Sequence, residues 1–139
     1  MPPAAQKVHA TTEKIAVLLV SAHRNDLDNL RGILPEKQWE ITQCPTAHDA
    51  ERAVSNRPHS VVICERDLDD GNWRDVVRRV GQSPDSPAVL VVSKDADEGL
   101  WADVLDDGGY DVLRKPFDRS ELTRAVELAW RHWLSSRSA

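Results

Sequence analysis

The chain has 139 residues, which is enough for one domain of ordinary size but not for two. Apolar residues make up 40% of it and charged residues 29%, so a buried core can form and general disorder is excluded. The net charge of −5 disfavours nucleic acid and anionic bilayers as partners, because both attract clustered lysine and arginine.

No segment has the pattern of a membrane span or an export signal. The apolar runs are far shorter than the roughly 20 residues that a membrane-spanning helix needs, and the polar start lacks the apolar centre of a signal peptide. Cys44 and Cys64 lack CxxC spacing and are too few for a disulfide framework. We therefore expect a cytoplasmic protein, with a flexible leader over residues 1–13 and a single domain over residues 14–139.

Three runs of consecutive apolar, mostly β-branched residues predict strands that are buried on both faces, as in a parallel sheet covered by helices. These runs are residues 15–20, 61–64 and 88–92. Two weaker candidates are residues 39–44, which alternate apolar and polar side chains as an edge strand does, and residues 111–114.

Apolar residues at helical spacing fill the segments between these strands. The sets are Leu27, Leu30, Ile33 and Leu34; Ala47, Ala50 and Val54; Val76, Val77 and Val80; Leu100, Val104 and Leu105; and Leu122, Ala125, Val126, Ala129 and Trp133. In the last helix, Asp118 or Ser120 is placed to cap the first turn. The strict alternation of strand and helix predicts an α/β fold with a doubly wound parallel sheet.

The carboxyl ends of parallel strands share one edge of a doubly wound sheet, and ligands bind at that edge. The residues that follow the predicted strands there include one carboxylate, Glu65, one hydroxyl, Ser93, and one ammonium, Lys115. We therefore expect these three side chains to converge on one site.

Several segments resemble the receiver domains of two-component response regulators. The resemblance extends over about residues 14–134. Its strongest matches are residues 113–118 (LRKPFD) with 121–122 behind them, the strand running into residue 65, residues 68–71 (LDDG), and residues 87–93. Each match is weak by itself, but their order and spacing are specific. The resemblance implies a flavodoxin-like (βα)5 fold with strand order 2-1-3-4-5.

The resemblance also implies roles for particular positions. In a receiver, an aspartate at the end of the third strand accepts a phosphoryl group, and an acidic pair after the first strand helps to hold Mg²⁺. A serine or threonine after the fourth strand and a lysine after the fifth contact the phosphoryl oxygens. Ser93 and Lys115 match these last two positions, and the bond from Lys115 to Pro116 is implied to be cis.

The acceptor, metal and switch positions depart from the receiver pattern. Glu65 stands at the phosphoacceptor position, Ser21 and Ala22 replace the acidic pair, and Val112 replaces the aromatic switch residue. One carboxylate remains of the expected three, whereas Mg²⁺ prefers near-octahedral oxygen ligands. Glutamate is also longer than aspartate by one methylene, about 1 Å, and phosphoryl transfer depends on positioning. We expect no catalytic residue, no metal ligands, and Mg²⁺ binding that is weak or lost.

In the absence of a metal ion, the Glu65 carboxylate is expected to pair with the Lys115 ammonium. Opposite charges about 4 Å apart at an intermediate dielectric attract by roughly 4 kcal/mol before desolvation is subtracted. The pair would place a permanent negative group near the position of the missing phosphoryl charge. The competing interpretation is a solvated strand-end carboxylate and a solvated loop ammonium.

Our main hypothesis is a pseudo-receiver, a signalling domain that is not an enzyme and acts through protein contacts without phosphorylation. Its partner would be a histidine kinase or an output protein. The alternative is a working receiver in a histidine kinase phosphorelay, with phosphorylation despite these substitutions or with Asp67 as acceptor.

A nucleotide or flavin binder is disfavoured, because residues 21–25 contain no glycine-rich phosphate loop. A DNA-binding regulator is disfavoured because no helix-turn-helix follows the last helix.

The resemblance further implies homodimerisation through the fourth helix, the fifth strand and the fifth helix. The fourth helix is acidic, whereas the fifth contains Arg119, Arg124 and Arg131. Such opposite charges on neighbouring elements favour an isologous contact, with Trp101 and Trp130 as candidate apolar anchors.

Overall fold

The computed structural model describes residues 14–82 and 85–138, so the expected leader over residues 1–13 lies outside the described residues. The strands of the main sheet are β1 (Ile15–Val20), β2 (Trp39–Cys44), β3 (Val61–Glu65), β6 (Ala88–Ser93) and β7 (Asp111–Arg114). They form a five-stranded parallel sheet in the order β2-β1-β3-β6-β7, which is the predicted order 2-1-3-4-5. The flavodoxin-like fold is therefore confirmed.

The ends of these strands differ from the prediction in one respect that matters for the site. Glu65 is the last residue of β3 and Ser93 is the last residue of β6, whereas the apolar runs of the sequence place both residues after their strands. Lys115 comes directly after β7, as predicted. All three positions therefore lie at the same edge of the sheet.

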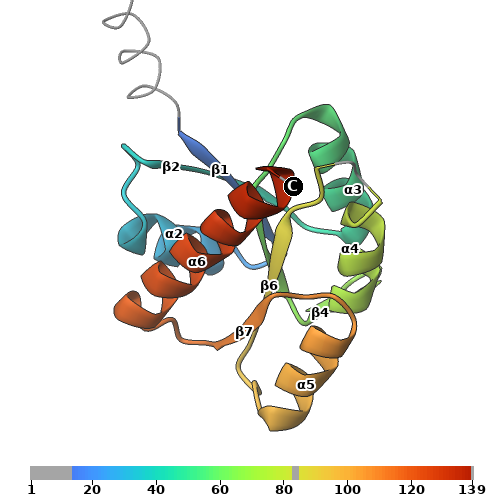
Figure 1. Ribbon diagram of the computed structural model, residues 1–139. Helices are drawn as coiled ribbons and strands as arrows, with labels where there is room; N and C mark the ends of the chain where they lie inside the picture. The colour runs from blue at the N-terminus through green and yellow to red at the C-terminus, as the bar shows by residue number, and fades with distance from the viewer. Residues whose placement is uncertain (1–13, 83–84, 139) are drawn as a thin grey trace, which may run out of the picture.

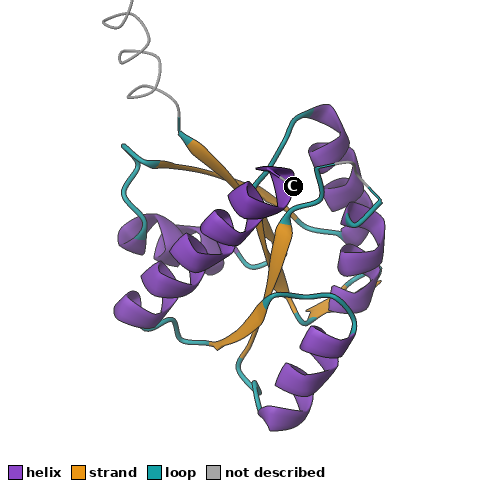
Figure 2. Cartoon of the chain, in the orientation of Figure 1, coloured by secondary structure: helices purple, strands orange, loops and turns teal. Residues whose placement is uncertain are grey.

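Helices cover both faces of the sheet (Figure 1, Figure 2). Their bounds are α2 (Arg24–Ile33), α3 (Ala47–Asn56), α4 (Trp73–Val80), α5 (Glu98–Asp106) and α6 (Arg119–Ser138). Of the two candidate caps for α6, Asp118 serves, because its carboxylate accepts the Glu121 backbone N–H at 2.9 Å, while Ser120 lies inside the helix. None of the described helices combines the length and apolar character needed to cross a membrane.

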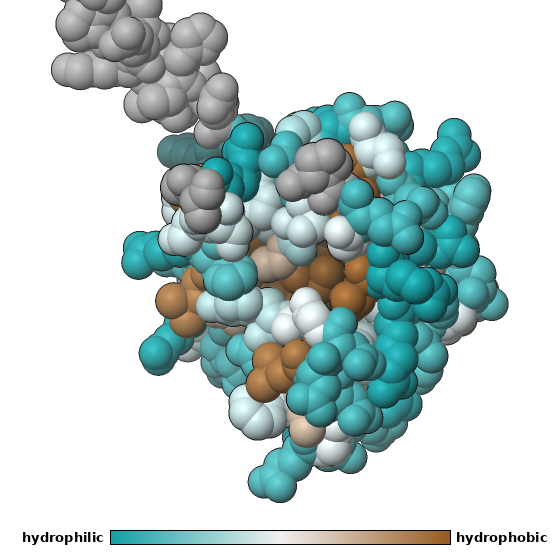
Figure 3. Space-filling model, turned by 45° about the vertical axis from the view of Figure 1, so that its right-hand side comes forward, coloured by the Kyte–Doolittle hydropathy of each residue, from teal (hydrophilic) through white to brown (hydrophobic). Residues whose placement is uncertain are grey.

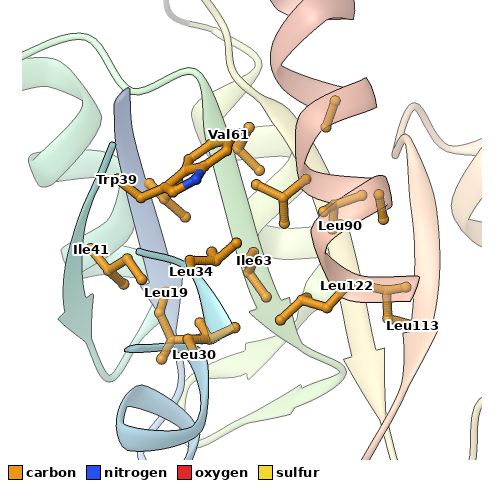
Figure 4. Close-up of a cluster of buried hydrophobic side chains, with 14 of the residues drawn as sticks. Leu19, Leu30, Leu34, Trp39, Ile41, Val61, Ile63, Leu90, Leu113 and Leu122 are labelled. Carbon is orange, nitrogen blue, oxygen red and sulfur yellow. The ribbon is translucent and has the colours of Figure 1, made fainter. Parts of the chain in front are cut away.

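Two hydrophobic clusters hold the layers together, one on each face of the sheet. Successive side chains of a strand point to opposite faces, so Val17 and Leu19 pack on one side and Leu18 and Val20 on the other. The first cluster includes side chains of α2 and α6 (Figure 4), and the second includes side chains of α3, α4 and α5. This two-sided burial explains why the central strands are continuously apolar.

Helix α5 buries fewer of its apolar side chains than its sequence predicted. Val104 is its one buried residue, whereas Leu105, expected on the packed face, is 39% exposed. Trp101 on the same helix is 50% exposed. Figure 1 shows α5 at the lower end of the molecule, beside the edge strand β7. An exposed tryptophan and leucine on an edge helix are typical of a contact surface.

A short hairpin that the sequence analysis did not anticipate joins β3 to α4. It consists of β4 (Asp67–Leu68) and β5 (Gly71–Asn72), which pair antiparallel. Gly71 has a φ of 150°, and a Cβ there would lie 2.0 Å from the Asp75 carboxylate, so this turn requires glycine. At the turn, the Asp70 carboxylate accepts the backbone N–H groups of Ala47 and His48 at 3.0 and 3.1 Å. The hairpin thus caps the start of α3.

Candidate functional site

Three side chains from distant parts of the chain meet at the carboxyl edge of the sheet. The Lys115 Nζ lies 2.5 Å from the Glu65 Oε2 and 3.1 and 3.0 Å from the two carboxylate oxygens of Asp26. The side chain of Lys115 is 10% exposed, that of Glu65 14% and that of Asp26 6%, so water screens these charges poorly. We refer to Asp26, Glu65 and Lys115 as the ion triad.

The two carboxylates contact the ammonium in different ways. Asp26 accepts hydrogen bonds from Lys115 Nζ, whereas the Glu65 contact is an ion pair without a well-aligned hydrogen bond at Oε2. Burial by itself would lower the pKa of Lys115, but its contacts with Glu65 and Asp26 outweigh burial and raise that pKa. Lys115 is therefore charged at neutral pH, and the expected pairing of Glu65 with Lys115 is present in the structure.

Ser21 and Ala22, which the sequence predicted to stand at the positions of the receiver acidic pair, have different surroundings. Ser21 is buried, donates its hydroxyl to the Asp26 Oδ2 at 2.7 Å and accepts the His23 backbone N–H at 3.0 Å. Ala22 is exposed, and its methyl group offers no ligand atom. The loop after β1 therefore contributes one hydroxyl, which already has partners.

Ser93 lies beside the site but directs its hydroxyl elsewhere. The Ser93 Oγ accepts the backbone N–H of Asp95 at 3.1 Å, and the Ser93 carbonyl accepts the backbone N–H of Lys115 at 3.1 Å. Ser93 thus positions Lys115 through the main chain. The Lys115-Pro116 peptide bond is cis, as predicted, and Pro116 is exposed.

The residue that the sequence predicted at the switch position is Val112, in β7. Val112 is half-buried and packs against the cluster that includes α3, α4 and α5. Tyr110, two positions earlier, is half-buried against the opposite cluster, with its ring 5.0 Å from the ring of His132. The aromatic side chain nearest in sequence therefore belongs to the other face of the sheet.

Asp67, the alternative acceptor, does not join the ion triad. Its side chain is 73% exposed and pairs with Arg66 at 3.0 Å. Arg66 also approaches Asp95 at 3.8 Å, in the loop before α5. Asp67 is thus part of an exposed ionic cluster on the hairpin.

A pocket of about 280 Å³ opens beside the ion triad. Its lining residues come from the loops after β1, β6 and β7 and from α2, and they are His23, Asn25, Asp26, Asn29, Lys94, Lys115, Pro116 and Phe117. The pocket gives small molecules a route to Lys115, whose ammonium already contacts two carboxylates.

Asp26 is the residue of this site that the sequence analysis missed. It matches no receiver motif, and an aspartate in the first turn of a helix is ordinarily a solvated group that favours the helix dipole. One signal was available: Asp26 lies four residues before Leu30, and residues at this spacing share a helix face. A carboxylate on the core-facing side of α2 requires a partner.

Comparison with known proteins identifies the family of the chain. Residues 17–127 match the family model of the response regulator receiver domain. No curated protein matches the chain.

Solved structures of receiver domains superpose closely on the chain. One is the signal receiver domain of an HD domain-containing protein from Pseudomonas fluorescens, with a TM-score of 0.81, 26% identity, and coverage of 91% of this chain and 94% of that one. The receiver domain of a putative LuxO repressor protein from Vibrio parahaemolyticus has a TM-score of 0.81, 19% identity, and coverage of 90% and 96%.

A third structure was determined with a metal ion. It is the receiver domain of the sensor histidine kinase PA1611 from Pseudomonas aeruginosa, with magnesium coordinated in its active-site cleft. Its TM-score is 0.74 at 18% identity, with coverage of 85% of this chain and 98% of that one. Since the family model spans most of the sequence, the chain belongs to the response regulator receiver domain family of two-component signalling.

Proposed function

We propose that this receiver domain signals through protein contacts without being phosphorylated, and that it is not an enzyme. The observation that carries the proposal is the ion pair between Glu65 and Lys115 at 2.5 Å. Glu65 occupies the acceptor position, and its carboxylate already contacts the lysine that a phosphoryl group would otherwise meet. A permanent carboxylate thus stands in for a transient phosphoryl charge.

The residues at the site do not fit Mg²⁺, and we propose that its binding is weak or lost. Mg²⁺ requires near-octahedral oxygen ligands at about 2.1 Å. Here the Ala22 side chain has no ligand atom, the Ser21 hydroxyl donates to Asp26, and both triad carboxylates contact an ammonium. Within the described ranges, no three histidine, cysteine, aspartate or glutamate side chains are grouped to hold a metal ion.

The proposed contact surface comprises α5, β7 and α6, which are the fourth helix, fifth strand and fifth helix. Trp101 and Leu105 of α5 and Leu128 of α6 are exposed, and a groove of about 490 Å³ runs along β7 and α6. Figure 3 shows apolar residues in the middle of the face that turns forward from the right of Figure 1, with hydrophilic residues around them. An apolar centre with a polar rim is typical of a protein interface.

A second copy of the chain is one proposed occupant of this surface, and a histidine kinase or an output protein is another. The acidic residues of α5 and the arginines of α6 favour an isologous dimer that weakens as salt is added. One structural relative, the NtrC4 receiver, is described as a dimer when activated by beryllofluoride. From the sequence we also propose a cytoplasmic location.

The proposal is tested by recording amide NMR spectra of the protein with Mg²⁺ and beryllofluoride, a phosphoryl analogue. We expect no change in the amide signals of Glu65, Ser93 and Lys115, because the site lacks a metal ligand set and an acceptor of the right length. Saturable shifts at these residues would show that the site still responds to a phosphoryl group, and a working receiver would then replace the proposal.

A further inference from the structure

Asp26 is held entirely by groups of the chain itself. Both of its oxygens accept hydrogen bonds from the Lys115 Nζ, and the Oδ2 also accepts the Ser21 hydroxyl at 2.7 Å. The residue is 5% exposed, on the same face of α2 as the fully buried Leu30. Its carboxylate therefore faces the site and not the solvent.

A buried carboxylate on a short helix needs a reason, because burial disfavours the charged form unless partners compensate for lost hydration. The same helix also carries Asp28, which is exposed. The partners of Asp26 come from the loops after β1 and after β7, 5 and 89 positions away along the chain. Asp26 thus links two loops that no backbone hydrogen bond of the main sheet joins directly, since β1 and β7 are not neighbours.

We propose that Asp26 is a positioning residue that fastens Lys115 beside Glu65, so that the loops after β1 and β7 keep one arrangement without a metal ion or a phosphoryl group. The inference rests on the proposed function and specifies how the site is kept in one state. Glu65 supplies the charge at the acceptor position, and Asp26 replaces, from a helix, the carboxylates that the loop after β1 lacks.

Loss of the Asp26 charge has consequences at two separate points. An Asp26→Asn variant would leave the Lys115 ammonium with Glu65 alone, so the attraction that keeps the ammonium charged would weaken. It would also weaken the contact with Ser21, whose hydroxyl in turn accepts the His23 backbone N–H. Removing this one charge from α2 is therefore expected to loosen both loops.

The test compares Asp26→Asn with Asp28→Asn, its matched control on the exposed side of α2. Lysine side-chain NMR follows the titration of Lys115, and amide exchange follows the backbone N–H groups of His23 and Lys115. We expect Asp26→Asn to lower the pKa of Lys115 and to speed exchange of both amides by about tenfold. Asp28→Asn should leave all three quantities unchanged.

Two further variants, Asp26→Glu and Ser21→Ala, also test the positioning role of Asp26. Asp26→Glu retains the charge and should keep the pKa of Lys115 nearer to that of the native protein than Asp26→Asn does, which a merely space-filling role would not produce. If Asp26→Asn does not fold, Ser21→Ala replaces it, and we then expect faster exchange at His23 with Lys115 still charged. Native titration of Lys115 in Asp26→Asn, or native His23 exchange in Ser21→Ala, would overturn the positioning role.

This outcome is separable from the proposed function. Phosphorylation of the native protein would contradict signalling without phosphorylation but would leave the Asp26→Asn measurements interpretable. Conversely, an unchanged pKa of Lys115 in Asp26→Asn would exclude the positioning role of Asp26. It would not affect the interpretation of Glu65 at the acceptor position.

Discussion

Asp26 and Lys115 lie 89 positions apart in the chain, yet both oxygens of the carboxylate lie within 3.1 Å of the same ammonium. With Glu65 at 2.5 Å on the same nitrogen, two carboxylates share one lysine. One of the two negative charges of the site is thus offset by a group that the fold itself provides. Such a site attracts a further cation less strongly than a site in which the acidic side chains lack a partner.

The first prediction concerns Lys115→Met, which keeps most of the side-chain volume and removes the charge. Asp26 and Glu65 would then lie buried without their shared cation, so the free energy of unfolding should fall by about 3 kcal/mol. Glu65→Gln should cost less, because Lys115 keeps Asp26 as a partner. Urea unfolding measures both, with Lys94→Met at an exposed position as the control. Equal, small losses in all three variants would show that the ion triad contributes little.

The second prediction concerns the buried His59 before β3. Burial lowers the pKa of His59, whose Nδ1 lies 3.0 Å from the Arg57 carbonyl. Because the unfolded chain takes up a proton near pH 6.5 and the folded protein does so only at lower pH, stability should fall as pH drops below about 6.5. In His59→Asn this part of the pH dependence should be absent. Thermal unfolding between pH 7.5 and 5 checks it, and parallel curves for both proteins would contradict it.

The third prediction concerns Asp70, which caps α3 from the hairpin. Burial acts to raise the pKa of Asp70, but hydrogen bonds from the Ala47 and His48 backbone outweigh it, so the pKa lies below its ordinary value. Its contribution should be complete above about pH 4 and disappear as pH falls through the lowered pKa. At pH 7, Asp70→Ala should cost about 1 kcal/mol in urea unfolding, whereas Asp69→Ala should cost nothing measurable. Equal effects of the two substitutions would exclude the capping role.

The sequence predicted the fold, two members of the ion triad and the neighbouring Ser93 for physical reasons. Buried strands of a parallel sheet are continuously apolar, and their ends share an edge, so Glu65, Ser93 and Lys115 had to lie close together. Asp26 was missed because its partners are far away in the chain, and the one local signal that distinguishes it from exposed Asp28 is its four-residue spacing from Leu30. The position of a hydroxyl is equally non-local, and the Ser93 Oγ turned out to bond Asp95.

Two other features could not be read from local patterns. The hairpin strands β4 and β5 have two residues each, which is too short for a periodic pattern of apolar residues to be detected in the sequence. The exposure of Leu105 depends on where α5 lies relative to β7. Helical spacing predicts which side chains share a face of the helix, but it does not predict which part of the protein packs against that face.

The fourth prediction concerns restoring the receiver pattern. Ser21→Asp, Ala22→Asp and Glu65→Asp together would return two metal ligands and shorten the acceptor side chain, so some Mg²⁺-dependent labelling by a small phosphodonor is expected. Each single change should fail, and Ser21→Asp alone places a second carboxylate beside Asp26, where the two repel. The matched control combines Ser21→Asp and Ala22→Asp with Glu65→Ala. Labelling of that control would place the phosphoryl group somewhere other than residue 65.

The most direct test of signalling without phosphorylation is to incubate the unaltered protein with Mg²⁺ and acetyl phosphate and to measure its intact mass. A receiver that carries the acidic pair and the acceptor aspartate serves as the positive control. We predict no phosphoryl adduct, because Lys115 contacts Glu65 and Asp26 and because we propose that Mg²⁺ binding is weak or lost. An Mg²⁺-dependent adduct on Glu65 or Asp67 would contradict this and identify the chain as a working phosphoacceptor.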